Sequence, residues 1–182
     1  HALTAFESGA DVFCDKPVAT SLQDTDDMIA AMQRHGRKLM VYQPHRADTA
    51  TVALREILSQ GLLGDVFLHK RTACWYSRRN DWQAYSKHGG GMLFNYGAHY
   101  VDQALSIAGT PFKRLSCSMR ALVTVGDADD FVKLLAETQD GTVMDIEINM
   151  AAAQSPSPWR VYGTRGSMVL DCEDGSDATK AA

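Results

Sequence analysis

Two stretches of the chain hold side chains of the types that move protons at a hydroxyl group. The first is Asp-Lys-Pro at residues 15–17, and the second spans residues 89–102 and contains Asn95 and His99. Imidazole has an unperturbed pKa near 6.5 and exchanges a proton at physiological pH, and a lysine ammonium donates hydrogen bonds. This combination is suited to removing the hydroxyl proton, the step that accompanies hydride transfer from an alcohol carbon.

The second stretch predicts a glycine-rich turn followed by a helix over residues 97–108. Its three glycines, residues 89–91, permit positive φ and a close approach to neighbouring groups. Asn95 is the predicted N-cap, and helical spacing then places Asn95, His99 and Asp102 on one face. The structural alternative is an N-cap amide, a histidine on the helix surface and an exposed carboxylate.

The first stretch follows a short apolar run, residues 11–14, which predicts a buried parallel strand. Proline favours extended geometry in the lysine before it and ends hydrogen-bonded pairing. We therefore expect Lys16 at the carboxyl end of a strand, where open α/β sheets bind ligands. A surface lysine in a turn and the Schiff-base lysine of an aldolase are the alternatives.

These motifs, together with Arg46, resemble the Gfo/Idh/MocA family of nicotinamide-dependent sugar and polyol oxidoreductases. The family pattern is E-K-P, then G-G-G and D-x-G-x-H-x-x-D, and this chain has Asp15 for the Glu and Asn95 for the Asp. The resemblance also includes a G-L-L-G turn at residues 61–64 and W-x-V-x-G-T-x-G-S at residues 159–167. It extends from the first residue to about residue 171.

The resemblance implies NAD or NADP as cofactor, an inositol-like polyol or a sugar as substrate, and a role for each matching residue. It makes His99 the proton acceptor and Lys16 the group that bonds the reacting hydroxyl. Asn95 would bond a neighbouring hydroxyl or orient His99; because an amide cannot accept the proton, His99 is favoured as the sole base. The implied cofactor contacts are Asp15, Lys16 and Pro17, and the implied substrate contacts are Arg46, Asn95 and His99. Trp82 is a further expected substrate contact, because its polar-aromatic loop at residues 76–88 suits a wall over a polar ligand; a solvated connector is the alternative.

Other functions also fit this resemblance. Some relatives bind the nucleotide without turnover, as sensors or interaction modules, and others use the cofactor to hydrolyse glycosides. The presence of both Lys16 and His99 favours chemistry over binding alone. Metal binding by His45, His99 and Asp102 is a weak alternative, since no H-x-x-x-H or H-x-H spacing occurs, and we expect no metal site.

The predicted elements divide the chain into two regions. Helices at residues 2–8 and 21–36 and strands at residues 11–14 and 38–42 predict the α/β remnant of a Rossmann domain over residues 1–44. Residues 45–182 predict an α+β substrate-binding domain with a mostly antiparallel open sheet. After a helix at residues 47–60, its strands are expected at residues 66–75, 114–125, 130–138, 142–150, 159–162 and 168–170. An aldolase barrel would instead keep alternating strands and helices.

The strand at residues 142–150 suggests how the protein assembles. Four apolar side chains from Met144 to Met150 alternate with Asp145, Glu147 and Asn149. One face therefore packs inward and the other forms a half-polar surface suited to a second copy of the chain. We expect a homodimer or homotetramer formed through this sheet, which the family resemblance also implies.

Composition excludes several classes of partner. A net charge of −4 gives no electrostatic reason to bind nucleic acid or an anionic membrane. No apolar run approaches the roughly 20 residues that span a bilayer, and no secretory signal opens the chain. The four widely spaced cysteines favour reduced thiols in the cytoplasm. No G-x-G-x-x-G occurs, so we expect that half of the nucleotide-binding domain to precede residue 1, and cofactor binding by this chain alone to be weak.

Overall fold

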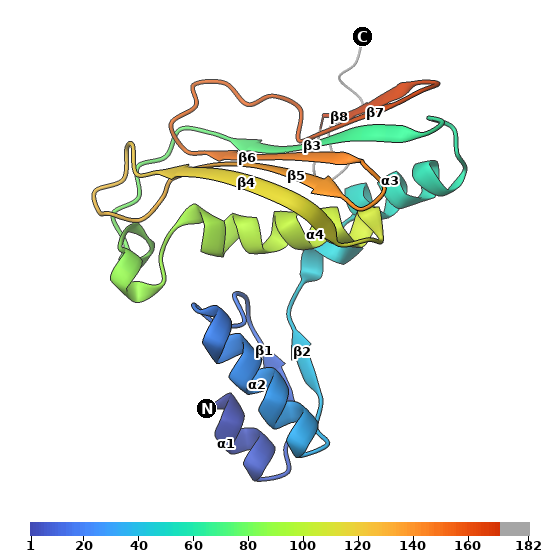
Figure 1. The fold of residues 1–182 in the computed structure, drawn as a ribbon. Coiled ribbons are helices and arrows are strands. Elements are labelled where there is room, and N and C mark those ends of the chain that lie inside the picture. The colour runs from blue at the N-terminus through green and yellow to red at the C-terminus, as the bar shows by residue number, and fades with distance from the viewer. Residues whose placement is uncertain (172–182) are drawn as a thin grey trace. The chain divides into compact units, whose positions relative to one another are not determined.

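The structure, a computed structural model, describes residues 1–171, and the chain forms two units that divide after Gln43 (Figure 1). The first unit contains helix α1 (Ala2–Glu7), strand β1 (Val12–Cys14), helix α2 (Leu22–Arg34) and strand β2 (Leu39–Val41). Strands β1 and β2 pair in parallel, which confirms the predicted strand–helix–strand arrangement. The hydroxyl of Ser21 accepts a hydrogen bond from the backbone N–H of Asp24 at 3.1 Å and caps α2.

The two strands of the first unit are covered on one face. Phe6 of α1 and Met28 of α2 are buried, but Phe13 of β1 is 64% exposed and Met40 of β2 is 63% exposed. The prediction of a buried strand at residues 11–14 is therefore wrong for this unit. Successive side chains of a strand point to opposite faces, so helices on one side leave Phe13 and Met40 uncovered.

The second unit begins with the 3₁₀ turn Pro44–Ala47 and helix α3 (Thr49–Ser59). Its other helix is α4 (Ala98–Ala108), and its strands form one six-stranded sheet in the order β4-β5-β6-β3-β7-β8. Within this sheet, over the residues that the structure describes, β3 and β6 pair in parallel and the other neighbouring strands pair antiparallel, which confirms the predicted mostly antiparallel sheet. The strand bounds are β3 (Val66–Cys74), β4 (Phe112–Arg120), β5 (Phe131–Thr138), β6 (Val143–Asn149), β7 (Trp159–Gly163) and β8 (Ser167–Leu170).

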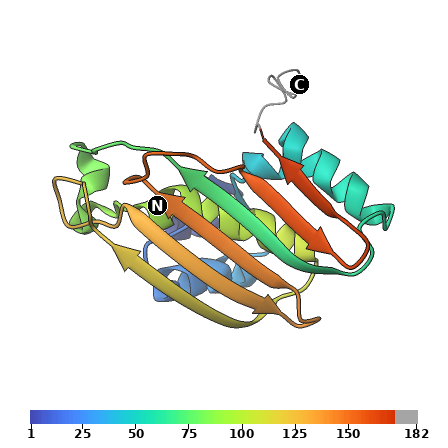
Figure 2. The same cartoon turned by 90° about the horizontal axis from the view of Figure 1, so that it is seen from above.

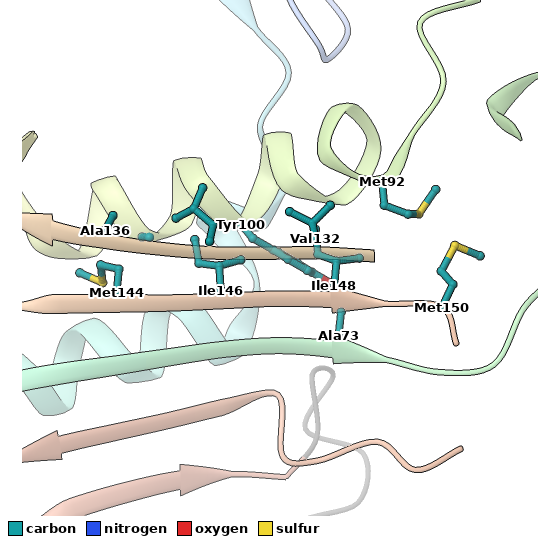
Figure 3. Close-up of a cluster of buried hydrophobic side chains, with 11 residues drawn as sticks. Ala73, Met92, Tyr100, Val132, Ala136, Met144, Ile146, Ile148 and Met150 are labelled. Carbon is teal, nitrogen blue, oxygen red and sulfur yellow. The ribbon is translucent and has the colours of Figure 1, made fainter. Parts of the chain in front are cut away.

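Helices α3 and α4 lie on the same face of the sheet (Figures 1 and 2). Under α4, Tyr100 packs on apolar side chains of β5 and β6, among them Val132 and Ile146 (Figure 3). Under α3, Leu54 packs with Leu63, Trp159 and Val161 in a second cluster of buried residues. These two cores fix α4, and with it His99, against the sheet.

The opposite face of the sheet carries no helix among the described residues (Figure 2). The alternation predicted for β6 is confirmed, because Met144, Ile146 and Ile148 are buried on the helix-covered face. On the open face Lys133 forms ion pairs with the carboxylates of Asp145, at 2.5 Å, and Glu147, at 3.0 Å. The open face is therefore partly charged and internally paired.

One predicted strand is too long. The sequence predicts a strand over residues 114–125, but β4 ends at Arg120 and a loop follows. Within that loop the carboxylate of Asp130 accepts hydrogen bonds from the backbone N–H groups of Leu122, Val123 and Thr124, at 2.8, 2.7 and 2.6 Å. A side chain that takes these donors competes with a neighbouring strand for them, and the strand ends there.

Candidate functional site

The glycine-rich stretch lies against the loop that follows β4. Gly91 has φ +110°, and a Cβ atom there would lie 2.2 Å from Oδ1 of Asp129. The other carboxylate oxygen of Asp129 accepts a hydrogen bond from the backbone N–H of Leu93 at 2.8 Å, and burial raises the pKa of this carboxyl group. The glycine is thus required by a close approach within the protein itself.

The helix after the glycines begins earlier than the sequence predicts. A π turn, Leu93–Gly97, leads directly into α4. Asn95 lies in the middle of this turn and its backbone N–H donates to the carbonyl of Gly91 at 3.0 Å, so its predicted role as an N-cap is wrong. Its side-chain amide donates instead to Oε1 of Gln83 at 2.8 Å. Isolated π turns are rare and frequently occur at functional sites.

His99 lies in the first turn of α4 and is 7% exposed. Its ring packs edge-to-face with that of His45, with 4.3 Å between centroids. Nδ1 of His45 is 2.5 Å from Oδ2 of Asp48. Asp48 is the N-cap residue of α3, yet its carboxylate makes no hydrogen bond to the first turn of that helix. An N-cap bond typically stabilises a helix by about 1 kcal/mol, and here the carboxylate holds an imidazole instead.

Arg46 is fixed by Asp102 in a bidentate ion pair. Nε and Nη2 of the guanidinium lie 2.7 and 2.6 Å from the two carboxylate oxygens, and this hydrogen bonding raises the pKa of Arg46. The Arg46 side chain remains 57% exposed. Of the three residues predicted to share one face, Asn95 therefore contacts Gln83. His99 and Asp102 both contact the Pro44–Ala47 turn, through His45 and Arg46 respectively.

Gln103, which the sequence does not single out, fixes the segment that carries His45. Its side chain is fully buried in α4, and its amide nitrogen donates to the carbonyl oxygen of His45 at 3.0 Å and to the hydroxyl of Thr51 at 2.9 Å. Its Oε1 lies 3.3 Å from Nε of the buried Arg71. A polar residue on the sheet-facing side of a helix was the available signal for Gln103, and an aspartate three residues after a histidine was the signal for Asp48.

Trp82 lies in the 3₁₀ turn Trp82–Ala84 and is 57% exposed. The carboxylate of Asp81 caps this turn by accepting from the backbone N–H of Gln83 at 3.0 Å. Because Gln83 also bonds Asn95, the turn that bears Trp82 is tied to the π turn. These contacts bring two of the predicted substrate residues, Trp82 and Asn95, into one local structure.

The predicted cofactor residues lie in the first unit, directly after β1. Oδ1 of Asp15 accepts from the backbone N–H of Lys16 at 2.8 Å, and the Lys16–Pro17 peptide bond is cis. Partial burial lowers the pKa of the Lys16 ammonium, against the attraction of Asp15. A partly desolvated lysine after a parallel strand fits a nicotinamide nucleotide bound at the carboxyl ends of β1 and β2.

Residues 1–171 contain neither a cluster of metal-ligating side chains nor a helix that could cross a membrane. No group of three or more His, Cys, Asp or Glu side chains in this range is placed to hold a metal ion. No helix in the same range is long and apolar enough to cross a membrane. The six-stranded mixed sheet also differs from the barrel that a Schiff-base aldolase would require.

Comparison with known proteins identifies two matching family models. Residues 51–169 match the GFO/IDH/MocA C-terminal domain, and residues 1–43 match the oxidoreductase family with an NAD-binding Rossmann fold. An uncharacterized oxidoreductase of Escherichia coli, YdgJ, is 26% identical over 92% of this chain and 49% of its own length. D-glucoside 3-dehydrogenase of the same organism is 30% identical over 61% of this chain and 32% of its own length.

A solved structure shows the same fold. The crystal structure of an NAD-binding protein from Listeria innocua has a TM-score of 0.88 and 27% identity, over 95% of this chain and 50% of that one. The chain spans about half the length of curated relatives such as YdgJ.

Proposed function

Because the chain belongs to the Gfo/Idh/MocA family of oxidoreductases, we propose that it functions in an NAD- or NADP-dependent dehydrogenase that acts on a hydroxyl carbon of a sugar or polyol. The observation that carries this proposal is the buried imidazole of His99, held by His45 in the first turn of α4. Imidazole is the side chain best suited to accept a hydroxyl proton near neutral pH. The relative named D-glucoside 3-dehydrogenase supports a sugar as substrate.

In the proposed reaction, His99 takes the proton of the reacting hydroxyl and becomes imidazolium as the carbinol carbon becomes a carbonyl carbon. When bound, the nicotinamide ring supplies the acceptor for the hydride. Following the family resemblance, the Lys16 ammonium donates a hydrogen bond to the reacting oxygen; its lowered pKa favours proton sharing with that oxygen. Arg46, Trp82 and Asn95 bind the other hydroxyls and the ring of the substrate, and Asp15 and Pro17 contact the cofactor.

The roles of His99 and Asn95 are separated by kinetics on the full-length protein. His99→Ala should lower kcat by roughly 10²–10⁴-fold, the usual contribution of a positioned general base. Its rate should also lose the rise through the histidine pKa. Asn95→Ala removes a hydrogen bond and no proton acceptor, so it should cost about 0.5–1.5 kcal/mol, much of it in KM. The measurement is kcat and kcat/KM against pH with NAD⁺ or NADP⁺.

Asn95→Asp is the matched control, since it restores the residue of the family pattern and should retain turnover. Near-normal turnover by His99→Ala together with an inactive Asn95→Ala would contradict the assignment of the base. Release of a sugar from a glycoside without net reduction of the nucleotide would favour the glycosidase alternative. Nucleotide binding without any turnover would favour the sensor.

We also propose that the protein assembles as a homodimer or homotetramer through the open face of the six-stranded sheet. That face presents exposed apolar side chains such as Leu135 beside the paired charges of Lys133 and Asp145. A surface that mixes apolar area with paired charges is typical of interfaces between copies of one chain.

A further inference from the structure

A cavity of about 330 Å³ lies where β7 ceases to cover β3. Strand β7 pairs with β3 up to Arg71, which lies opposite Trp159. At this end of the pairing the backbone N–H of Thr72 donates a hydrogen bond to the carbonyl of Pro158 at 2.9 Å. Beyond that point the edge of β3 borders the cavity. Hydrogen-bonding directions alternate along a strand, so the backbone polar groups of Cys74 point to the same side as those of Thr72.

Three aromatic rings form one wall of the cavity. Trp75, which directly follows β3, packs against Tyr96 of the π turn with 5.1 Å between ring centroids, and Tyr96 packs against Tyr100 at 5.9 Å. The guanidinium of Arg71 lies over the ring of Tyr100, 3.9 Å from its centroid. All three rings line the cavity. The wall is therefore rigid at Tyr100 and more accessible at Trp75 and Tyr96, which are half-buried.

The remaining lining mixes polar and apolar residues, and it is uncharged. The hydroxyl-bearing residues Thr72 and Ser155 contribute to it, and none of the described residues that line the cavity has a charged side chain. Binding pockets for small molecules typically measure about 300–1,000 Å³ and combine aromatic walls with a few polar groups that fix orientation. This cavity is at the lower end of that range, which suits a ligand the size of one ring.

We propose that this cavity binds an uncharged pyranose ring. The C–H face of such a ring packs on an aromatic side chain, and its hydroxyl groups at the rim bond to hydroxyls and to strand-edge backbone groups. A phosphorylated or carboxylated sugar would bring a charge into an uncharged pocket, and burying an unpaired charge is costly. An acyclic polyol lacks the flat face that matches the aromatic wall.

The cavity also adjoins the helical turn that carries the proposed base. Tyr96 and Tyr100 lie on either side of His99 in the sequence, three residues before it and one residue after it. A preference of the enzyme for pyranosides over acyclic polyols as substrates rests on the proposed function. Binding of a pyranose in the cavity requires neither cofactor nor turnover and depends on the cavity alone.

The test is a titration of the 182-residue chain with methyl β-D-glucopyranoside, followed through the indole N–H signals in a ¹H–¹⁵N spectrum. The Trp75 signal, assigned from a Trp75→Phe variant, should shift and saturate with a Kd in the millimolar range. Methyl β-D-glucuronide, which carries a carboxylate, and xylitol should each bind at least tenfold more weakly. A Trp75 signal that does not move, or moves equally with all three compounds, overturns the proposal.

Two variants distinguish loss of the binding site from unfolding of the protein. Trp75→Ala, followed through the backbone amide signals of the same spectra because its indole reporter is gone, should weaken binding at least tenfold. Ser155→Phe should do the same by filling the cavity from the exposed segment between β6 and β7, without removing a core contact. Phe67→Ala is the control, because Phe67 lies on the same strand, is exposed and does not line the cavity. Unchanged binding in a folded Ser155→Phe variant would overturn the proposal. Binding without any dehydrogenase activity would overturn only the proposed function.

Discussion

Substitution of Gly91 by alanine tests whether the glycine motif is required by contacts within the protein. The new Cβ would lie 2.2 Å from Oδ1 of Asp129, and φ is +110°. Holding a non-glycine residue in that region costs about 1–3 kcal/mol. Displacing the Asp129 carboxylate also breaks its bond to the N–H of Leu93, and leaving a buried donor without its partner costs about 1–3 kcal/mol. The free energy of unfolding should therefore fall by about 2–6 kcal/mol.

Gly141→Ala provides the matched control. Gly141 also has positive φ, +90°, but no atom lies within 4 Å of a Cβ built there. It should lose only the backbone contribution, so Gly91→Ala should be more destabilising by about 1–3 kcal/mol. The assay is urea denaturation of each variant, with stability taken from the linear extrapolation.

A second comparison isolates the contact with Asp129. In an Asp129→Ala background the carboxylate is gone, so adding Gly91→Ala should cost about as much as Gly141→Ala does. The coupling between the two sites should reach about 1 kcal/mol or more. Equal destabilisation by Gly91→Ala and Gly141→Ala, with no coupling to Asp129, would refute the reasoning.

Two further predictions follow from the sheet. Burial lowers the pKa of His69 to about 4, so its stabilising contribution is complete above the unfolded value of about 6.5 and is lost as the pH falls toward 4, by up to about 3 kcal/mol. Urea denaturation against pH should show this loss in the wild type and a flatter profile in His69→Phe; equal profiles would contradict it. Light scattering should give a dimer or tetramer for the wild type and a smaller species for Leu135→Glu on the open face, whereas a monomeric wild type would contradict the proposed assembly.

Several elements could be predicted from the sequence because the signals that define them are local. Ser21 caps α2 through a bond to a residue three positions away. The alternation in β6 separates buried from open-face residues, and Asp140-Gly141 marks the turn between β5 and β6. Each of these depends on backbone geometry over a few residues, so composition and spacing suffice to predict it.

The surroundings of the candidate site depend on contacts that spacing does not encode. Arg46 and Asp102 are 56 positions apart, and the bond between them needs α4 to lie beside the turn that precedes α3. Asp48 could equally have capped its own helix; packing places the ring of His45 within its reach instead. Local sequence therefore predicts an ordinary cap where the folded chain has a carboxylate–imidazole pair.

Local patterns and motifs were enough to predict the order and type of most elements, the family, and His99 and Lys16 as candidate catalytic groups. Long-range packing places Asn95 in a π turn bonded to Gln83, and makes Gly91 necessary beside Asp129. It also brings three aromatic rings to the border of an uncharged cavity at the edge of β3. Periodicity indicates which way a side chain faces, whereas its partner depends on how distant elements pack.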